Sequence, residues 1–173
     1  MGYKQPPKPA SNWNVSYVPI PRPILAIPAE VHRRISTHLV DSYPSEGCGV
    51  LVGKKNLAGS YREVHRSHAI SNASEQSLTD SYELDAEEFL LADKQAAADA
   101  LEIVGVYHSH PDSAASPSPS ATDLLRAKTI WKSSTSFSYL IVNIAADRSA
   151  KMSSWRLERS AFVQETIKEL VGA

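Results

Sequence analysis

His108 and His110 are the residues of this chain whose types and spacing most directly suggest chemistry. They close the apolar run "EIVGVYHSH", which is typical of a buried strand. Side chains two positions apart on a strand point to the same face, so both imidazoles can reach one metal ion. A polar strand end without a function would show the same pattern, and the pair alone does not decide between the two readings.

Asp123 supplies a third candidate ligand, after a loop rich in proline and serine. Ser120 and Asp123 fit a Ser-x-x-Asp pattern, which is close to a capping box and predicts that a helix begins here. A carboxylate in the first turn of a helix is held in place and can be directed at a metal. Two neutral imidazoles, one carboxylate and an open fourth position make a catalytic zinc site.

Glu46 is the candidate general base that a zinc hydrolase would also need. It lies in "YPSEGCGVLVG", directly before an apolar run, Cys48 to Gly53, that predicts a buried strand. A glutamate at the end of a loop and exposed to solvent is the alternative. Cys48 itself is expected to be a small buried hydrophobic residue rather than a redox group.

The composition excludes several classes of protein. Eighteen Lys and Arg residues balance 19 Asp and Glu residues, so the basic stripe of a nucleic-acid binder is missing. A single cysteine excludes an internal disulfide framework and a cysteine-rich zinc site. The chain shows no signal peptide and no run of about 18 apolar residues, so we expect a cytoplasmic protein with no membrane partner.

The elements that would position these residues form one domain. Residues 1–23, which include Trp13 and Tyr17, are rich in proline and are expected to form an extended or disordered arm before a domain at 24–173. Helices are predicted at 29–43, with Pro44 beyond the end of the first, and at 85–101 and 120–132. Strands are predicted at 48–53, 60–70, 81–84, 102–110, 137–145 and 151–158, whereas 162–170 is ambiguous. We therefore expect an α/β (α+β) domain with a mixed β-sheet flanked by two main helices.

The order of these motifs resembles the JAMM (JAB/MPN) metalloprotease family, from about Ile24 to Trp155. The flanking stretches "EIVGVYHSHPD" and "FSYLIVNI…SSWRL" are similar to the bacterial branch that acts on ubiquitin-like sulfur carrier proteins. The resemblance implies one Zn²⁺ per chain and a small β-grasp partner with a Gly-Gly C-terminus, and it leaves a homodimer open. The implied reaction is hydrolysis of the peptide or isopeptide bond after that Gly-Gly, which releases cysteine or a short tail.

The resemblance also implies a role for each site residue. His108, His110 and Asp123 correspond to the zinc ligands, Glu46 to the general base, and Ser120 to a hydrogen-bond donor to the oxyanion. Ser109 receives no role, because its side chain should point away from the face of the histidines.

One spacing departs from the family pattern. Nine residues separate His110 from Ser120, where seven are usual. Ser118 stands at the usual spacing, but its partner three residues later would be Ala121, which cannot bind a metal. We therefore prefer Ser120 with Asp123 and accept a longer loop.

Residues required by two other classes of zinc enzyme are missing from the sequence. A metallo-β-lactamase-like site would need a histidine after Asp112, where Ser113 stands, and a nucleobase deaminase would need more cysteines. A non-catalytic MPN-type scaffold remains the alternative, although such domains typically lack one of the ligands or the glutamate. Segment 71–83 is long and polar, and we expect it to border the substrate groove and to hold an extended peptide by adding a strand.

Overall fold

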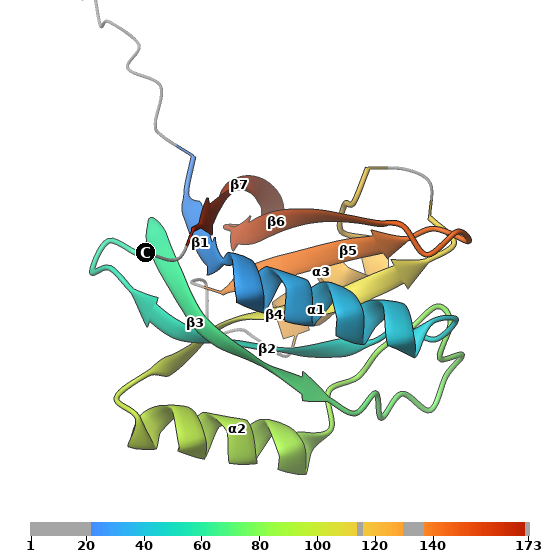
Figure 1. The fold of residues 1–173 in the computed structure, drawn as a ribbon, viewed down its shortest axis with the longest axis horizontal. Helices are drawn as coiled ribbons and strands as arrows, with labels where there is room; N and C mark the ends of the chain where they lie inside the picture. The colour runs from blue at the N-terminus through green and yellow to red at the C-terminus, as the bar shows by residue number, and fades with distance from the viewer. Residues whose placement is uncertain (1–21, 114–115, 130–136, 172–173) are drawn as a thin grey trace, which may run out of the picture.

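The computed structural model describes residues 22–113, 116–129 and 137–171. Seven strands and three helices occur in this part of the chain (Figure 1). The strands are β1 (Ile24–Pro28), β2 (Cys48–Lys55), β3 (Tyr61–Ile70), β4 (Glu102–Pro111), β5 (Ser138–Ile144), β6 (Ala150–Glu158) and β7 (Ala161–Leu170). The helices are α1 (Ala29–Ser42), α2 (Ala86–Ala98) and α3 (Ala121–Thr129).

The seven strands close into a barrel in the order β1-β3-β2-β4-β5-β6-β7. Closure depends on β1, which pairs in parallel with β3 on one side and with β7 on the other. The expected sheet flanked by two main helices is therefore wrong, although the domain still combines helices and strands. The prediction lacked the two strands that close the barrel. It included no strand at the position of β1, and it left 162–170, which form most of β7, ambiguous between strand and helix.

Alternating side chains along the central strands belong to two separate hydrophobic cores. Leu51 on β2 and Tyr107 on β4 pack with Ile35 and Leu39 of α1. Their neighbours on the opposite face pack with α2 and α3, as Val50 and Val106 do. The central strands are thus covered on both faces, by α1 on one and by α2 and α3 on the other.

Most of the other predicted elements are confirmed, with shifts at their ends. The predicted strand at 81–84 is absent, and only a single bridge joins Leu84 to Asn72. The predicted third helix ends at Thr129 within the described residues. Trp13, Tyr17 and Trp131 lie outside the part of the chain that the structure describes. Across the described ranges, no helix is both long and apolar enough to span a membrane.

The N-cap of α2 provides a test of the local energetics. The Asp85 carboxylate accepts hydrogen bonds from the backbone N–H groups of Glu87 and Glu88, at 3.1 and 2.9 Å. Replacing Asp85 with alanine should cost about 1 kcal/mol of stability, because two donors of the first turn lose their partner. Urea denaturation of both proteins would measure the difference, and an unchanged midpoint would contradict this role.

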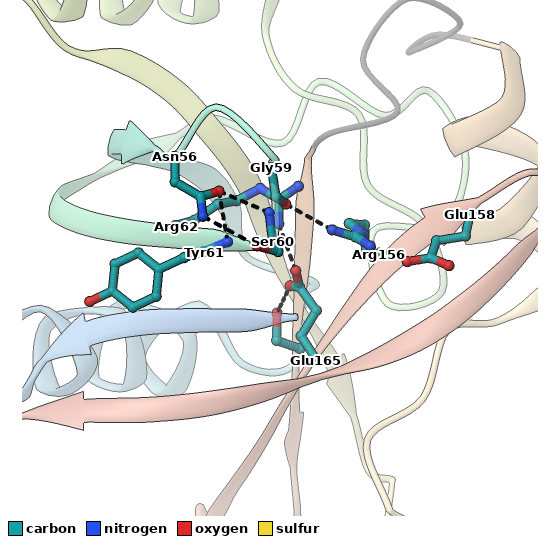
Figure 2. A network of polar contacts seen from close by, with 9 residues as sticks. Asn56, Gly59, Ser60, Tyr61, Arg62, Arg156, Glu158 and Glu165 are labelled. Carbon is teal, nitrogen blue, oxygen red and sulfur yellow. Dashed lines mark hydrogen bonds and ion pairs between the residues drawn. The ribbon is translucent and has the colours of Figure 1, made fainter. Parts of the chain in front are cut away.

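A buried ion pair joins Arg62 and Glu165 (Figure 2). Arg62 pairs with Lys55 at the end of β2, away from Cys48 at its start. Arg62 Nη1 donates to Glu165 Oε1 at 2.8 Å, and both side chains are fully buried. Ser154 Oγ donates to the other carboxylate oxygen at 2.7 Å. Burial raises the pKa of Glu165, an effect that the nearby donors and the Arg62 charge oppose. This network joins β3, β6 and β7 across the closure of the barrel.

Candidate metal centre

Three candidate ligand side chains converge where the end of β4 meets the start of α3. His108 Nε2 lies 3.0 Å from His110 Nε2 and 3.2 Å from Asp123 Oδ1. His110 Nε2 lies 3.3 Å from Asp123 Oδ2. The structure therefore brings these three side chains together.

The fold fixes each ligand from a different direction. His108 pairs across the sheet with Cys48 at the start of β2 and with Ile141 of β5, and its side chain is fully buried. Asp123 lies in the first turn of α3 and is also buried. The N–H and Oγ–H groups of Ser120 both donate to Asp123 Oδ2, each at 2.7 Å, and Asp123 N–H donates back to Ser120 Oγ. The predicted cap thus holds the carboxylate in place.

The electrostatic surroundings of His108 and Asp123 favour the forms that bind a metal, whereas those of His110 favour the protonated ring. Burial lowers the pKa of His108, so the neutral imidazole that a metal requires is favoured. Burial disfavours protonation of His110, but the bond to Asp123 and its charge raise the pKa above the ordinary value. Burial also opposes ionisation of Asp123, yet the histidines outweigh it and hold the pKa of this carboxyl well below its usual range.

The residues fit a zinc ion. Zinc–nitrogen bonds of 2.0–2.1 Å in a tetrahedron separate neighbouring ligand atoms by about 3.3 Å. The two imidazole nitrogens are 3.0 Å apart, and each lies 3.2–3.3 Å from one oxygen of the Asp123 carboxylate, so the three side chains are close enough to share one ion. Two imidazoles and one carboxylate are also the donor set that leaves a fourth position open in catalytic sites. The group could therefore hold a metal ion.

Glu46 is buried beside this group, with 7% of its surface exposed. Burial raises its pKa to about 7, and the charges of His110 and Asp123 also act on it, with opposite signs. The solvent-exposed alternative for this glutamate is therefore wrong. A carboxyl group with a pKa near neutrality can both accept and return a proton.

The backbone on either side of Glu46 is held firmly. Its N–H donates to Leu78 O at 2.6 Å. The next N–H, of Gly47, donates to Ser109 Oγ at 2.9 Å, and Ser109 N–H donates to Gly47 O at 3.0 Å. A Cβ at Gly47 would approach Ser42 Oγ of α1 to within 2.6 Å, so a larger residue here would require the side chains of α1 to shift. Ser109 thus points away from the histidines, as expected, and ties β4 to the segment that carries the glutamate, just before β2.

Tyr82 and Arg126 are further residues of the site that the sequence did not reveal. The Tyr82 ring stacks on the His108 imidazole, with centroids 4.2 Å apart. The Arg126 guanidinium lies 5.1 Å from the centre of the Tyr82 ring. Arg126 follows Asp123 by three positions on a helix, and this spacing could have indicated a shared face. Tyr82 gave no such signal, because 81–84 resembled a strand.

The remaining candidates lie outside the group of His108, His110 and Asp123. Cys48 is fully buried, and burial raises its pKa to about 12, which agrees with a hydrophobic residue rather than a reactive thiol. His32, His38, His65 and His68 are half-buried or exposed on α1 and β3, outside the group of three ligands.

The fold and the group of His108, His110 and Asp123 are those of a JAB-type domain with a candidate metal site. The family model for prokaryotic homologues of the JAB domain matches residues 28–158, and the chain belongs to this family. That span contains Glu46 and all three ligand residues.

Curated relatives share roughly half of the chain. A desampylase of Haloferax volcanii is 45% identical over 87 residues, covering 49% of this chain and 55% of the relative. A probable TtuB-protein conjugate cleaving protease of Thermus thermophilus is 32% identical over 96 residues, covering 56% and 60%. A desampylase of Pyrococcus furiosus is 36% identical over 110 residues, covering 62% and 71%. The chain therefore spans less than two thirds of the length of the first two relatives.

Solved structures share the fold more completely. A protein from Desulfitobacterium hafniense has a TM-score of 0.72 at 25% identity, over 86% of this chain and 94% of that one. A protein from Salinibacter ruber has a TM-score of 0.62 at 33% identity, over 84% and 91%.

Proposed function

We propose that this protein is a zinc-dependent peptidase or isopeptidase that hydrolyses the bond after the C-terminal Gly-Gly of a ubiquitin-like protein. The convergence of His108, His110 and Asp123 beside the buried Glu46 carries the proposal. The family of JAB-domain homologues supports a hydrolase, and the printed names of the relatives, desampylase and conjugate cleaving protease, support a protein conjugate as the substrate.

The chain supplies a base and a donor for this reaction. When bound, zinc polarises the scissile carbonyl and lowers the pKa of water. Glu46 accepts the proton of the attacking water and returns it to the leaving amine. Ser120 donates a hydrogen bond to the oxyanion, for which its hydroxyl must turn away from Asp123 Oδ2. Its backbone N–H still holds the carboxylate when the hydroxyl turns.

The substrate we propose is a small β-grasp sulfur carrier. Glycines before the cut lack side chains, so they can pass a narrow approach to a buried site. The leaving group is cysteine or a short tail. The buried, unpaired Cys48 and the absence of other cysteines favour a reducing compartment, and we propose the cytoplasm.

A cleavage assay with metal removal tests this function. The probe is a ubiquitin-like protein that ends in Gly-Gly followed by a short peptide tail, with an Ala-Ala version as control. Mass spectrometry should show release of the tail from the Gly-Gly probe only. Activity should disappear after chelation and return with added zinc, because His108, His110 and Asp123 then regain their ion.

A non-catalytic scaffold would give a different result. It would bind the probe without cutting it at any zinc concentration. Cleavage that persists after complete removal of the metal would also contradict the proposal.

A further inference from the structure

Residues 71–84 form an irregular loop that lies against the metal centre. Its two ends meet through the bridge between Asn72 and Leu84, and Ala73 N–H donates to Glu83 O at 2.8 Å. Both the N–H and Oγ–H of Ser71 donate to the Glu88 carboxylate of α2, each at 2.7 Å. A loop tied at its base in this way can place its interior side chains accurately.

Asn72 uses its complete hydrogen-bonding capacity in this loop. Its Nδ2 donates to Glu46 O at 2.9 Å and to Ser81 O at 3.0 Å. Its Oδ1 accepts from the N–H groups of Ser74 and Glu83, both at 3.0 Å. An amide side chain has two donor hydrogens and two acceptor positions, and all four are used. The side chain thus binds the loop to the backbone of the proposed base.

Tyr82 makes the second connection, to the metal ligand. Its ring is buried and stacks on the His108 imidazole at an interplanar angle of 22°. On α3, Arg126 lies near the same ring, and its Nη2 donates to Ser81 Oγ at 2.6 Å. A cation within about 6 Å of an aromatic centroid is attracted to it.

The stack matters because His108 lacks the usual support for a ligating histidine. Such a histidine normally donates its second ring N–H to a carboxylate or carbonyl, and this bond sets the ring orientation. His108 Nδ1 is buried and has no hydrogen-bond partner among the described residues. Stacking on Tyr82 is then a contact that helps to hold the plane of this imidazole, beside those of its Nε2 with His110 and Asp123.

We propose that residues 71–84 act as a positioning element for both halves of the site, with Asn72 fixing Glu46 and Tyr82, braced by Arg126, fixing His108. This inference rests on the proposed function for its kinetic readout. Neither residue contacts the reacting atoms, so both act through the groups that they hold. The loop thereby sets the placement of the base relative to the ligand group.

The role of Asn72 is tested by Asn72→Asp, which keeps both hydrogen-bond acceptors of the side chain and loses both donors. The kcat should fall about 10- to 100-fold with KM and zinc content unchanged, because the base shifts but the ligands do not. Amide hydrogen exchange at Glu46 and along 72–83 should accelerate, since the bond from Glu46 N–H to Leu78 O lies in the same network. Asn72→Ala should act in the same direction and adds no charge.

Asn56→Asp is the matched control. Asn56 Oδ1 accepts from the N–H groups of Ser60 and Tyr61, and its Nδ2 donates to Ser60 Oγ, so it also organises a loop (Figure 2). That loop joins β2 to β3 at the opposite end of β2 from Cys48. The control should leave kcat and the exchange of Glu46 unchanged.

The role of Tyr82 is tested by the zinc affinity of variants, measured by competition with a chromophoric chelator. Tyr82→Phe should keep the affinity, because the ring is retained, whereas Tyr82→Leu should weaken it about 10- to 100-fold. Arg126→Gln should weaken it in the same direction without opening a cavity. Arg126→Gln provides the test if Tyr82→Leu does not fold.

Three results would overturn the proposal. These are unchanged exchange at Glu46 in Asn72→Asp, faster exchange at Glu46 in Asn72→Asp without a loss of kcat, and equal zinc affinity in Tyr82→Phe and Tyr82→Leu. If the wild-type protein binds zinc but cuts no probe, the proposed function fails. Exchange and zinc affinity would still decide the positioning role.

Discussion

Replacing Glu46 with glutamine should lower kcat by about 10²- to 10⁴-fold while the protein keeps its zinc. Glutamine has nearly the shape of glutamate, but it cannot take a proton from water at neutral pH. Glu46 is buried and its pKa is raised to about 7 by that burial, so the neutral amide introduces no unpaired charge. Folding stability should therefore be unchanged, and single-turnover kinetics with the Gly-Gly probe would measure the loss.

His110→Ala is the matched comparison for this variant. His110 Nε2 lies at 3.0 Å from His108 Nε2, within the ligand group, so its removal should lower the zinc content together with activity. Metal analysis of both variants separates the two roles. Equal zinc loss in Glu46→Gln and His110→Ala would contradict the assignment of Glu46 as the base.

Replacing Arg62 with methionine should destabilise the fold by about 3–5 kcal/mol. The change leaves the fully buried Glu165 carboxylate without the cation that lies 2.8 Å away (Figure 2). Burial already raises the pKa of Glu165, and loss of Arg62 should raise it further. The stability deficit should be small near the ordinary pKa and should grow as the pH rises through the folded value, because only the unfolded chain then ionises freely.

Denaturant titrations at about pH 5 and about pH 8 would measure this dependence. Arg34→Met is the control, because the Arg34–Glu30 pair is exposed on α1 and should contribute less than about 1 kcal/mol. The double variant Arg62→Met with Glu165→Leu should recover part of the loss, since no charge then remains buried. A pH-independent deficit, or equal effects in Arg62→Met and Arg34→Met, would exclude a buried charge as the cause.

The ligand group was predictable because each of its parts is encoded locally. Strand alternation places His108 and His110 on one face, and the Ser120–Asp123 cap fixes the carboxylate. The sequence could not supply the contacts between distant segments. The Asn72 bond to Glu46 O joins residues 26 positions apart, and no periodicity predicts such a bond.

Barrel closure was missed for a related reason. β1 has five residues, and it follows directly after a proline-rich stretch that resembled an arm. β7 buries little of its surface apart from Glu165, so its alternation of apolar and polar residues is weak. Both strands are defined by the partners they find rather than by their own pattern, since β-strand preference depends strongly on context.

The parallel pairing of β1 with β7 has a consequence for how the chain tolerates shortening. A protein that ends before residue 161 would leave the backbone donors and acceptors of β1 and β6 without their neighbour. Exposed strand edges of this kind recruit strands from other molecules, so such a truncated protein would be prone to aggregate. Solubility thus depends on the last strand of the barrel, far along the sequence from the first strand that it protects.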